Sequence, residues 1–183
     1  MVKDASDERP VYFADATHLH HNSEPAYGWI LKGKNKDLKS NSGRQRSNIN
    51  GAYCLHNHTV VQRADETINA GSMIALFMQI EEANPGAEKI RVVVDNARYN
   101  HARELKEFER CSRIEMVYLP PYSPNLNLIE RLWLLLKKNV VYNKFFESFK
   151  DFREAIENFF TGLLDRKLEL RQLMAPNFQV IGA

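Results

Sequence analysis

The run Ile90–Val94 is the feature of the sequence that most restricts the fold. Its residues, IRVVV, lack the alternation of apolar and polar side chains that marks a strand with one face in water. A strand without alternation is expected to be covered on both faces, as parallel strands are in α/β proteins. The run therefore predicts a layered fold, with a sheet between other elements.

Other segments of the chain show the patterns of further strands and helices. Residues 11–17 alternate and predict a strand, and further strands are expected at 27–33, 49–58, 59–64 and 115–119. Helices are expected at 70–83, 101–110 and 128–140, and a last helix with Ser148 as N-cap and Asp151 as its third-position partner. This order predicts an α/β fold whose mixed sheet has three antiparallel strands followed by parallel strands, flanked by helices.

Length and composition indicate one globular domain. The chain has 183 residues, of which 44% are hydrophobic and 26% charged. We expect a flexible leader at 1–10, a folded domain at 11–165, and a helical extension and tail at 166–183. There is no secretory signal or apolar run of membrane-spanning length, and the two cysteines, Cys54 and Cys111, form no CxxC pair. A cytoplasmic location is expected.

Positive charge is concentrated in one segment, although the whole chain carries a formal charge of only +2. Residues 31–50 contain Asp37 as their only acidic residue, against a group of basic residues: Lys32, Lys34, Lys36, Lys39, Arg44 and Arg46. Such a group can bind nucleic-acid phosphates, or it can be a solvated surface loop. We expect these six residues to contact DNA.

Three acidic residues stand where a purely structural carboxylate is poorly placed, and each also has a simpler explanation. Asp15 lies within an apolar strand, where an unpaired carboxylate is costly to bury, but it can also lie on an exposed strand face. Asp95 follows a buried strand, where α/β sheets bind ligands, but with Asn96 it can also form an Asx turn. Glu130 opens an apolar helix, but with Asn127 it also fits a capping box.

The three together are more informative than each alone. Two strand aspartates and a glutamate at a helix start can converge on a pair of divalent cations, which activate a water and stabilise the leaving oxygen in phosphodiester cleavage. Oxygen ligands suit Mg²⁺, with Mn²⁺ as a substitute. Asp15, Asp95 and Glu130 are therefore the predicted metal ligands and catalytic residues.

The strings around these residues resemble the three acidic motifs of the DDE transposases of bacterial insertion sequences, in the mariner-like superfamily. They are FADATH, VVVDNARYN and LPPYSPNLNLIERLW, and 34 residues separate Asp95 from Glu130, an interval typical of that superfamily. The third string is the most specific, and the resemblance extends over about residues 11–160. It implies an RNase H-like fold and a metal-binding triad of Asp15, Asp95 and Glu130.

The resemblance also implies an activity and partners. Such enzymes cleave DNA at transposon ends and join the freed 3′ hydroxyl to target DNA, so double-stranded DNA is the expected partner and a homodimer the expected active form. A helix-turn-helix region that recognises the terminal repeats would lie upstream, possibly on a separate chain. The chain is thus expected to be a catalytic domain or the second reading frame of a split element.

The chain departs from the family pattern at three positions. Ala16 stands where an acidic residue is common, Leu128 where a proline is usual, and Asn100 where a histidine is usual, with His101 one residue later. Leucine lacks the fixed φ of proline but is a good helix former, so that change is expected to alter stability rather than abolish the site. The Asn100 change leaves open whether activity is full, reduced or lost.

Alternative functions also fit the sequence. The chain can be a non-catalytic DNA-binding or oligomerisation remnant of a transposase, or an RNase H-like nuclease that cleaves RNA/DNA hybrids. A zinc site is a further alternative, because five histidines occur in two groups: His18, His20, His21, His56 and His58. Without a thiolate partner or an HExxH motif, structural or DNA-contacting roles are favoured for them.

Overall fold

The computed structural model of the protein describes residues 5–33, 37–41, 44–121 and 126–175. Its centre is a five-stranded sheet with the strand order β3-β2-β1-β4-β5. The strands are β1 (Val11–His20), β2 (Arg46–Cys54), β3 (Val60–Asp65), β4 (Ile90–Val94) and β5 (Ile114–Tyr118). The first three pair antiparallel, whereas β1 with β4 and β4 with β5 pair parallel. This confirms the predicted mixed sheet.

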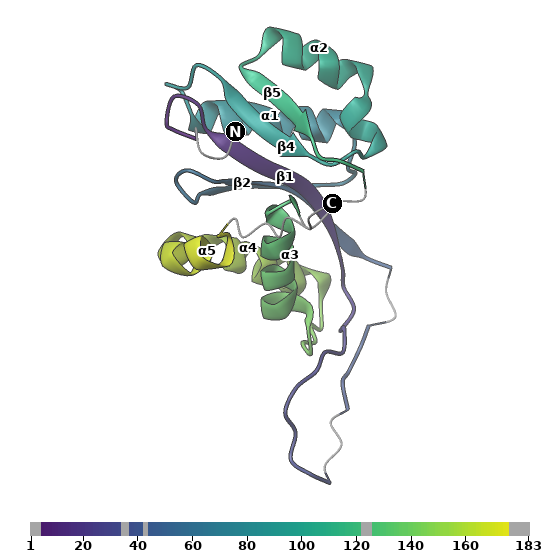
Figure 1. Ribbon diagram of the computed structural model, residues 1–183. Coiled ribbons are helices and arrows are strands. Elements are labelled where there is room, and N and C mark those ends of the chain that lie inside the picture. The colour runs from purple at the N-terminus through teal and green to yellow at the C-terminus, as the bar shows by residue number, and fades with distance from the viewer. Residues whose placement is uncertain (1–4, 34–36, 42–43, 122–125, 176–183) are drawn as a thin grey trace.

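Helices cover both faces of the sheet (Figure 1). One face carries α1 (Ala70–Ala83) and α2 (Arg103–Cys111), and the other carries α3 (Ile129–Leu136), α4 (Phe149–Leu163) and α5 (Lys167–Leu173). Further elements among the described residues are the 3₁₀ turns η2 (Arg98–His101) and η5 (Leu164–Arg166) and a π-helical segment, η4 (Lys137–Val141). No helix in these described ranges has the length and apolar composition needed to cross a bilayer.

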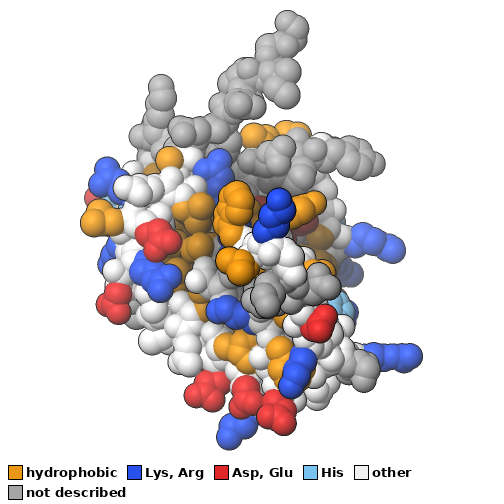
Figure 2. All heavy atoms as spheres, turned by 90° about the horizontal axis from the view of Figure 1, so that it is seen from below, with side chains coloured by type: hydrophobic (Ala, Val, Ile, Leu, Met, Phe, Trp, Pro, Cys, Tyr) orange, Lys and Arg blue, Asp and Glu red, His pale blue; other side chains and the backbone are white. Residues whose placement is uncertain are grey.

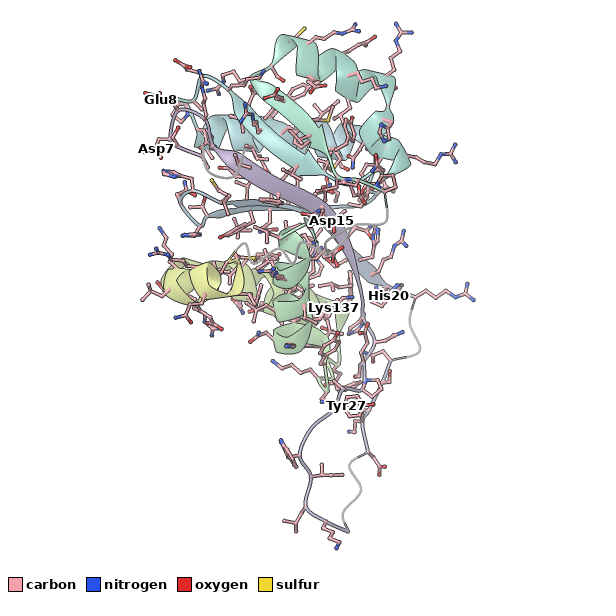
Figure 3. All side chains as sticks on the ribbon, viewed as in Figure 1. Asp7, Glu8, Asp15, His20, Tyr27 and Lys137 are labelled. Atoms are coloured by element: carbon pink, nitrogen blue, oxygen red, sulfur yellow. The ribbon has the colours of Figure 1, made fainter. Side chains whose placement is uncertain are left out.

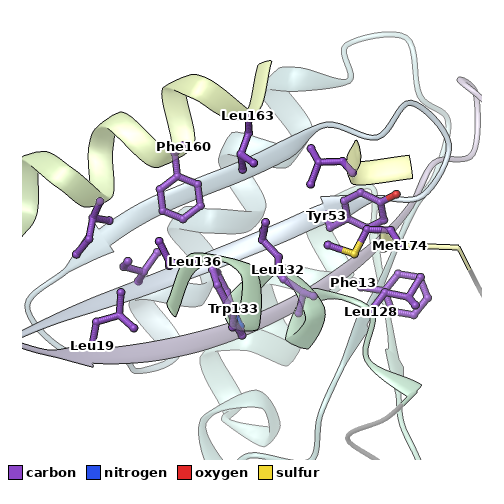
Figure 4. Close-up of a cluster of buried hydrophobic side chains, with 14 of the residues drawn as sticks. Phe13, Leu19, Tyr53, Leu128, Leu132, Trp133, Leu136, Phe160, Leu163 and Met174 are labelled. Carbon is purple, nitrogen blue, oxygen red and sulfur yellow. The ribbon is translucent and has the colours of Figure 1, made fainter. Parts of the chain in front are cut away.

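Two hydrophobic cores lie on the two faces of the sheet. Alternation along β1 sends Phe13 into the core under α3 and α4 and Tyr12 into the core under α1. Figure 4 shows the first core, where Trp133 and Leu132 of α3 pack between the sheet and α4. The valines of β4 divide between both cores, as the lack of alternation in that strand predicts.

Local capping signals explain several helix ends. The α1 helix begins after Asn69, whose side chain accepts from the backbone N–H of Ser72 at 3.0 Å, and its bounds match the predicted helix at 70–83. The α4 helix begins after Ser148, whose Oγ accepts from the N–H of Asp151 at 3.1 Å, as predicted. The helix expected at 128–140 is α3 continued by η4.

Between β1 and β2, the described residues 22–33, 37–41, 44 and 45 form an arm that projects away from the sheet (Figure 1). The strand expected at 27–33 is wrong, because no residue of that range belongs to a strand. The side chains of Tyr27 and Trp29 are fully exposed, at 109% and 105%. These apolar residues have no surface to pack on, and an apolar segment without burial does not favour a strand.

The strand expected at 49–58 is shifted. β2 spans Arg46–Cys54, because it follows β1 over the full length of their antiparallel pairing. The chain then turns back to β3 through His58, which has a positive φ of 59°. The N–H of Cys54 donates to the carbonyl of Thr59 at 2.8 Å and closes this turn.

The base of the arm is fixed to the end of η4. Glu24 forms an isolated parallel bridge with Tyr142, and the N–H of Asn143 donates to the carbonyl of Glu24 at 2.9 Å. The side-chain amide of Asn143 accepts from and donates to the backbone of Ala26, both at 3.0 Å. The arm is therefore attached to the layer that contains α3.

Candidate active site

Asp15 lies on the face of β1 that points to α3, beside the start of that helix (Figure 3). It is partly buried, and its direct partner in the neighbouring strand β2 is Gly51. The indole Nε1–H of Trp133 donates to Oδ2 of Asp15 at 3.1 Å. The alternative of an aspartate on a fully exposed strand face is therefore wrong.

Gly51 makes room for this contact. A Cβ added at Gly51 would lie 2.5 Å from the Cη2 atom of the Trp133 ring and 3.1 Å from Cζ2. Such distances are far below van der Waals contact, so the ring takes the space that a side chain at position 51 would need. The glycine thus allows the indole to reach the carboxylate across β2.

Asp95 follows β4 directly, and the pairing of the strands places it level with Asp15. In the parallel pairing of β1 with β4, Phe13 is opposite Val93, and the same register continued by two residues sets Asp15 opposite Asp95. The backbone pairing of β1 with β4 ends at Phe13, so the two chains part there. The aspartates therefore flank the point where neighbouring strands diverge, which is where open α/β sheets bind ligands.

Hydrogen bonds fix the orientation of the Asp95 carboxylate. Its Oδ1 accepts from the N–H of Ala97 at 3.0 Å, which is the Asx turn considered from the sequence, and from Nδ2 of Asn100 at 2.9 Å. Both bonds go to the same oxygen. The turn and a role of Asp95 in the site are compatible, because the turn orients the side chain.

Asn100 occupies the position where the family pattern has histidine. The residue is 2% exposed. In addition to the bond from its side chain to Asp95, its backbone carbonyl accepts from the hydroxyl of Tyr118 at 2.7 Å. His101 instead stacks on the Tyr118 ring, with ring centroids 4.6 Å apart. Asn100 therefore supports the aspartate, while the histidine next to it packs at the surface.

Glu130 lies in the first turn of α3 and is exposed. The capping-box alternative is wrong: the N-cap is Leu128, without a side-chain cap, and Nδ2 of Asn127 donates to the carbonyl of Ala14 at 3.2 Å. This buried bond ties the start of α3 to β1, one residue before Asp15. Leu128 is fully buried and has a φ of −62°, the value that proline would impose.

Electrostatics show that the three carboxylates share one region. Burial, and next the negative charge of Glu130, raise the pKa of Asp15 from 3.8 to about 7, and Asp95 adds to the rise. The N–H of Ala16 and the indole of Trp133 oppose it. Mutual repulsion of this kind favours the binding of either a proton or a cation.

As they stand, these carboxylates do not form a finished metal site. In the part of the chain that the structure describes, no group of three or more His, Cys, Asp or Glu side chains is arranged to hold a metal ion. This covers the histidines, which make separate contacts. His18 bonds to Asn48 at 2.8 Å, His58 to Tyr53 at 2.6 Å, and His56 pairs with Asp7 at 3.1 Å.

The basic residues of the arm, and Arg46 at the start of β2, lie apart from the carboxylates. Lys32, Lys39, Arg44 and Arg46 are exposed, and Lys34 and Lys36 lie outside the described residues. The arm begins beyond the end of β1, which Asp15 precedes by five residues. Figure 3 shows Tyr27 on the arm at a distance from Asp15.

Sequence reasoning missed three residues that support the carboxylates: Trp133, Asn127 and Asn100. The sequence favours a core position for Trp133, from which it sets the angle of the Glu130 carboxylate, but it does not predict the bond to Asp15. Asn127 was assigned to a cap. The signal for Asn100 was its departure from the family pattern, which pointed to the position but not to its contact.

We expect Gly51→Ala to disturb Asp15 by displacing Trp133. The added methyl group clashes with the ring, and overpacking of a core usually costs about 1–3 kcal/mol. Chemical denaturation should show that loss, and tryptophan fluorescence should show a changed environment of the indole. Gly86→Ala is the matched control, because a Cβ there meets no atom within 4 Å. Equal stability of the Gly51 variant and the wild type would show that the ring moves aside without cost.

The chain matches a known protein family and a curated relative. The family model described as "DDE superfamily endonuclease" matches residues 10–153. The insertion element IS630 uncharacterized 39 kDa protein of Shigella sonnei is 26% identical over 145 residues, which are 78% of this chain and 42% of that protein.

Solved structures show the same fold at low identity. The Mos1 transposase paired-end complex with left transposon end matches with a TM-score of 0.64 and 14% identity, over 92% of this chain and 56% of that chain. The HTLV-2 integrase catalytic core domain in complex with magnesium (trimeric form) matches with a TM-score of 0.55 and 15% identity, over 84% of this chain and 83% of that chain. The fold is thus the RNase H-like α/β fold, and the chain belongs to the DDE superfamily endonucleases.

Proposed function

We propose that this chain is the catalytic domain of a transposase that cleaves DNA strands and transfers them to a target, with Asp15, Asp95 and Glu130 as metal ligands. The observation that carries the proposal is the convergence of these carboxylates: two aspartates level on neighbouring strands and a glutamate whose charge acts on one of them. The chain spans 42% of the Shigella sonnei relative and 56% of the Mos1 chain, so the activity of a whole transposase is part of the proposal.

The cation of this site is proposed to be Mg²⁺, with Mn²⁺ as a substitute. The donor set fits, because hard carboxylate oxygens are what both ions prefer, and because positive charge relieves the repulsion that raises the pKa of Asp15. When bound, the metal activates a water or a 3′ hydroxyl and stabilises charge on the leaving oxygen. Similar folds include a Mos1 mariner paired end complex with Mn, which supports the choice.

The residues of the chain itself orient the ligands. Trp133 holds Oδ2 of Asp15, and Asn100 holds Oδ1 of Asp95. Asn127 fixes the start of the helix that carries Glu130. Residues that orient metal ligands commonly change metal affinity or activity about 10- to 100-fold when they are replaced.

The proposal is tested by strand cleavage. The wild-type chain should nick duplex DNA in Mn²⁺ or Mg²⁺ and should be inactive in EDTA. An RNA/DNA hybrid of the same sequence separates this function from that of a hybrid-specific nuclease, which would cleave the hybrid and spare the duplex. Nicking that persists in EDTA would contradict a metal-dependent mechanism.

We propose further that the arm contacts DNA through its basic residues. Each Lys or Arg that neutralises a phosphate contributes to the salt dependence of binding, with a slope of about −0.9 per phosphate. Replacing Lys32, Arg44 and Arg46 by alanine should therefore flatten the plot of log affinity against log salt by up to about three such contributions. Lys167→Ala, which removes an exposed lysine of α5, is the control. An unchanged slope in the triple variant would remove this role.

The active form is proposed to be a homodimer in the cytoplasm. Four apolar side chains of the arm are exposed: Tyr27, Trp29, Ile30 and Leu31. An exposed apolar group of this size is typical of an interaction surface.

The division into a leader at 1–10, a catalytic domain at 11–165 and an extension at 166–183 stays a prediction. DNA recognition by an upstream region, on this chain or on a separate one, is likewise a prediction.

A further inference from the structure

A pocket of about 520 Å³ lies between η4 and α4. It is remote from Glu130, because Glu130 lies in the first turn of α3 and η4 follows the last turn of that helix. Three aromatic rings line it: Phe145, Phe146 and Phe159. Phe145 is 40% exposed, so part of the aromatic surface is open to a ligand.

The polar groups of the pocket are cationic or neutral. Lys144 and Arg166 line it together with the amide of Asn158, and none of its lining residues, all of them within the described ranges, is acidic. The ammonium group of Lys144 donates to the backbone carbonyl of Asn139, which holds it at the wall. Figure 2 views the molecule from below and shows hydrophobic side chains beside Lys and Arg on that face.

Gly162 forms part of the wall and leaves space there. It is the penultimate residue of α4. A Cβ added to it would meet no atom within 4 Å, so close packing does not require a glycine. A larger residue at this position would reduce the pocket.

The opposite wall belongs to the π-helical segment η4. Asn139 lines the pocket from this segment, and its side-chain amide donates to the carbonyl of Leu135 at 2.8 Å. π-helical segments are uncommon and frequently occur at functional sites. The segment also continues the helix of Glu130, which fixes the distance between the pocket and the carboxylates.

We propose that this pocket binds an unpaired nucleotide of a DNA strand, with the base against the aromatic rings and the phosphate near Lys144 and Arg166. Aromatic rings accept any base by stacking, and cations in a pocket whose lining residues include no acidic one suit a phosphate. Asn139 follows Glu130 by nine helical positions, a span of about 14 Å.

This inference rests on the proposed function for the identity of the strand, but its test needs no cleavage. Fluorescence anisotropy in EDTA compares a blunt duplex with the same duplex that carries a short single-stranded extension. Stacking of one base corresponds to at least about a fivefold gain in affinity, so the wild type should prefer the extended duplex by that factor. An abasic site at one position of the extension should abolish the preference.

Two variants test the pocket from different sides. Gly162→Leu should fill it without removing any polar or aromatic group, and Phe145→Ala should remove its most exposed ring. Both should lose the preference for the extension and keep the affinity for the blunt duplex. Gly86→Leu is the matched control, since it adds the same side chain in open space elsewhere. Circular dichroism checks that each variant is folded.

Several outcomes would overturn the inference. Both pocket variants could keep the preference, or abasic substitution at every position could leave it intact, which would indicate phosphate contacts alone. Loss of self-association in the variants with unchanged DNA binding would assign the pocket to a protein contact. A chain that shows the base-dependent preference but never cleaves DNA would leave the pocket standing and refute the proposed catalytic function instead.

Discussion

Replacing Asp95 by asparagine is expected to reduce metal-dependent strand cleavage by at least about 10³-fold. The charge stabilisation that a metal ion supplies in such reactions is worth several kcal/mol, and each 1.36 kcal/mol corresponds to a factor of ten in rate. The amide keeps the shape of the side chain and can still accept from Ala97, so the fold should be unaffected. Asp15→Asn and Glu130→Gln are expected to cause losses of similar size.

The measurement is nicking of duplex DNA in Mn²⁺, with DNA affinity determined in parallel. Asp151→Asn serves as the control, because Asp151 is an exposed residue in the first turn of α4. The double variant of Asp95 and Glu130 should lose no more cleavage activity than the single variants, because the effects of residues that act as one unit are not additive. Cleavage by the Asp95 variant within about tenfold of the wild type would place the metal elsewhere.

The metal-free protein is expected to lose stability as the pH rises from about 4 to about 7. The pKa of Asp15 is raised in the folded state from 3.8 to about 7 by burial and by the charge of Glu130. The folded protein therefore holds a proton that the unfolded chain has already lost, and its stabilising contribution disappears as the pH passes the folded pKa. At 1.36 kcal/mol for each pKa unit, the loss is at most about 4 kcal/mol.

Chemical denaturation at pH 5 and pH 8 measures this effect. Asp15→Asn should be more stable than the wild type at pH 8 and equal to it near pH 4. Glu115→Gln is a control of opposite sign, because a hydrogen bond from Arg91 lowers the pKa of Glu115, and its contribution is lost on acidification. Mg²⁺ should stabilise the wild type at pH 8 and not the Asp15 variant. If the difference between wild type and Asp15→Asn were the same at both pH values, the raised pKa would be wrong.

The sequence predicted the elements that have strong local patterns. The α1 helix and β4 occur at the predicted residues, because apolar residues at helical spacing before Asn84, Pro85 and Gly86, and an apolar run without alternation, are local signals. The strand expected at 27–33 failed for the converse reason: the apolar residues there are also a local signal, but no neighbouring surface buries them. Whether a pattern is used depends on packing partners that lie far away in the sequence.

The candidate site was predictable in its residue types and not in its geometry. Carboxylates in apolar surroundings pointed to Asp15, Asp95 and Glu130. The register that sets the two aspartates level depends on how β1 pairs with a strand that begins 70 residues after its own end, which no local pattern reports. The bonds from Trp133 and Asn127 across the sheet are long-range in the same way.

The parallel pairing of β1 with β4 has a constant offset of 80 in residue number, from Val11 opposite Arg91 to Phe13 opposite Val93. Inserting or deleting a single residue before Asp15 in β1, or before Asp95 in β4, would turn that aspartate to the other face of the sheet, because side chains alternate with a period of two. The arm lies outside that register. Homologues should therefore vary freely in arm length, while indels within 11–15 or 90–95 are incompatible with a working enzyme.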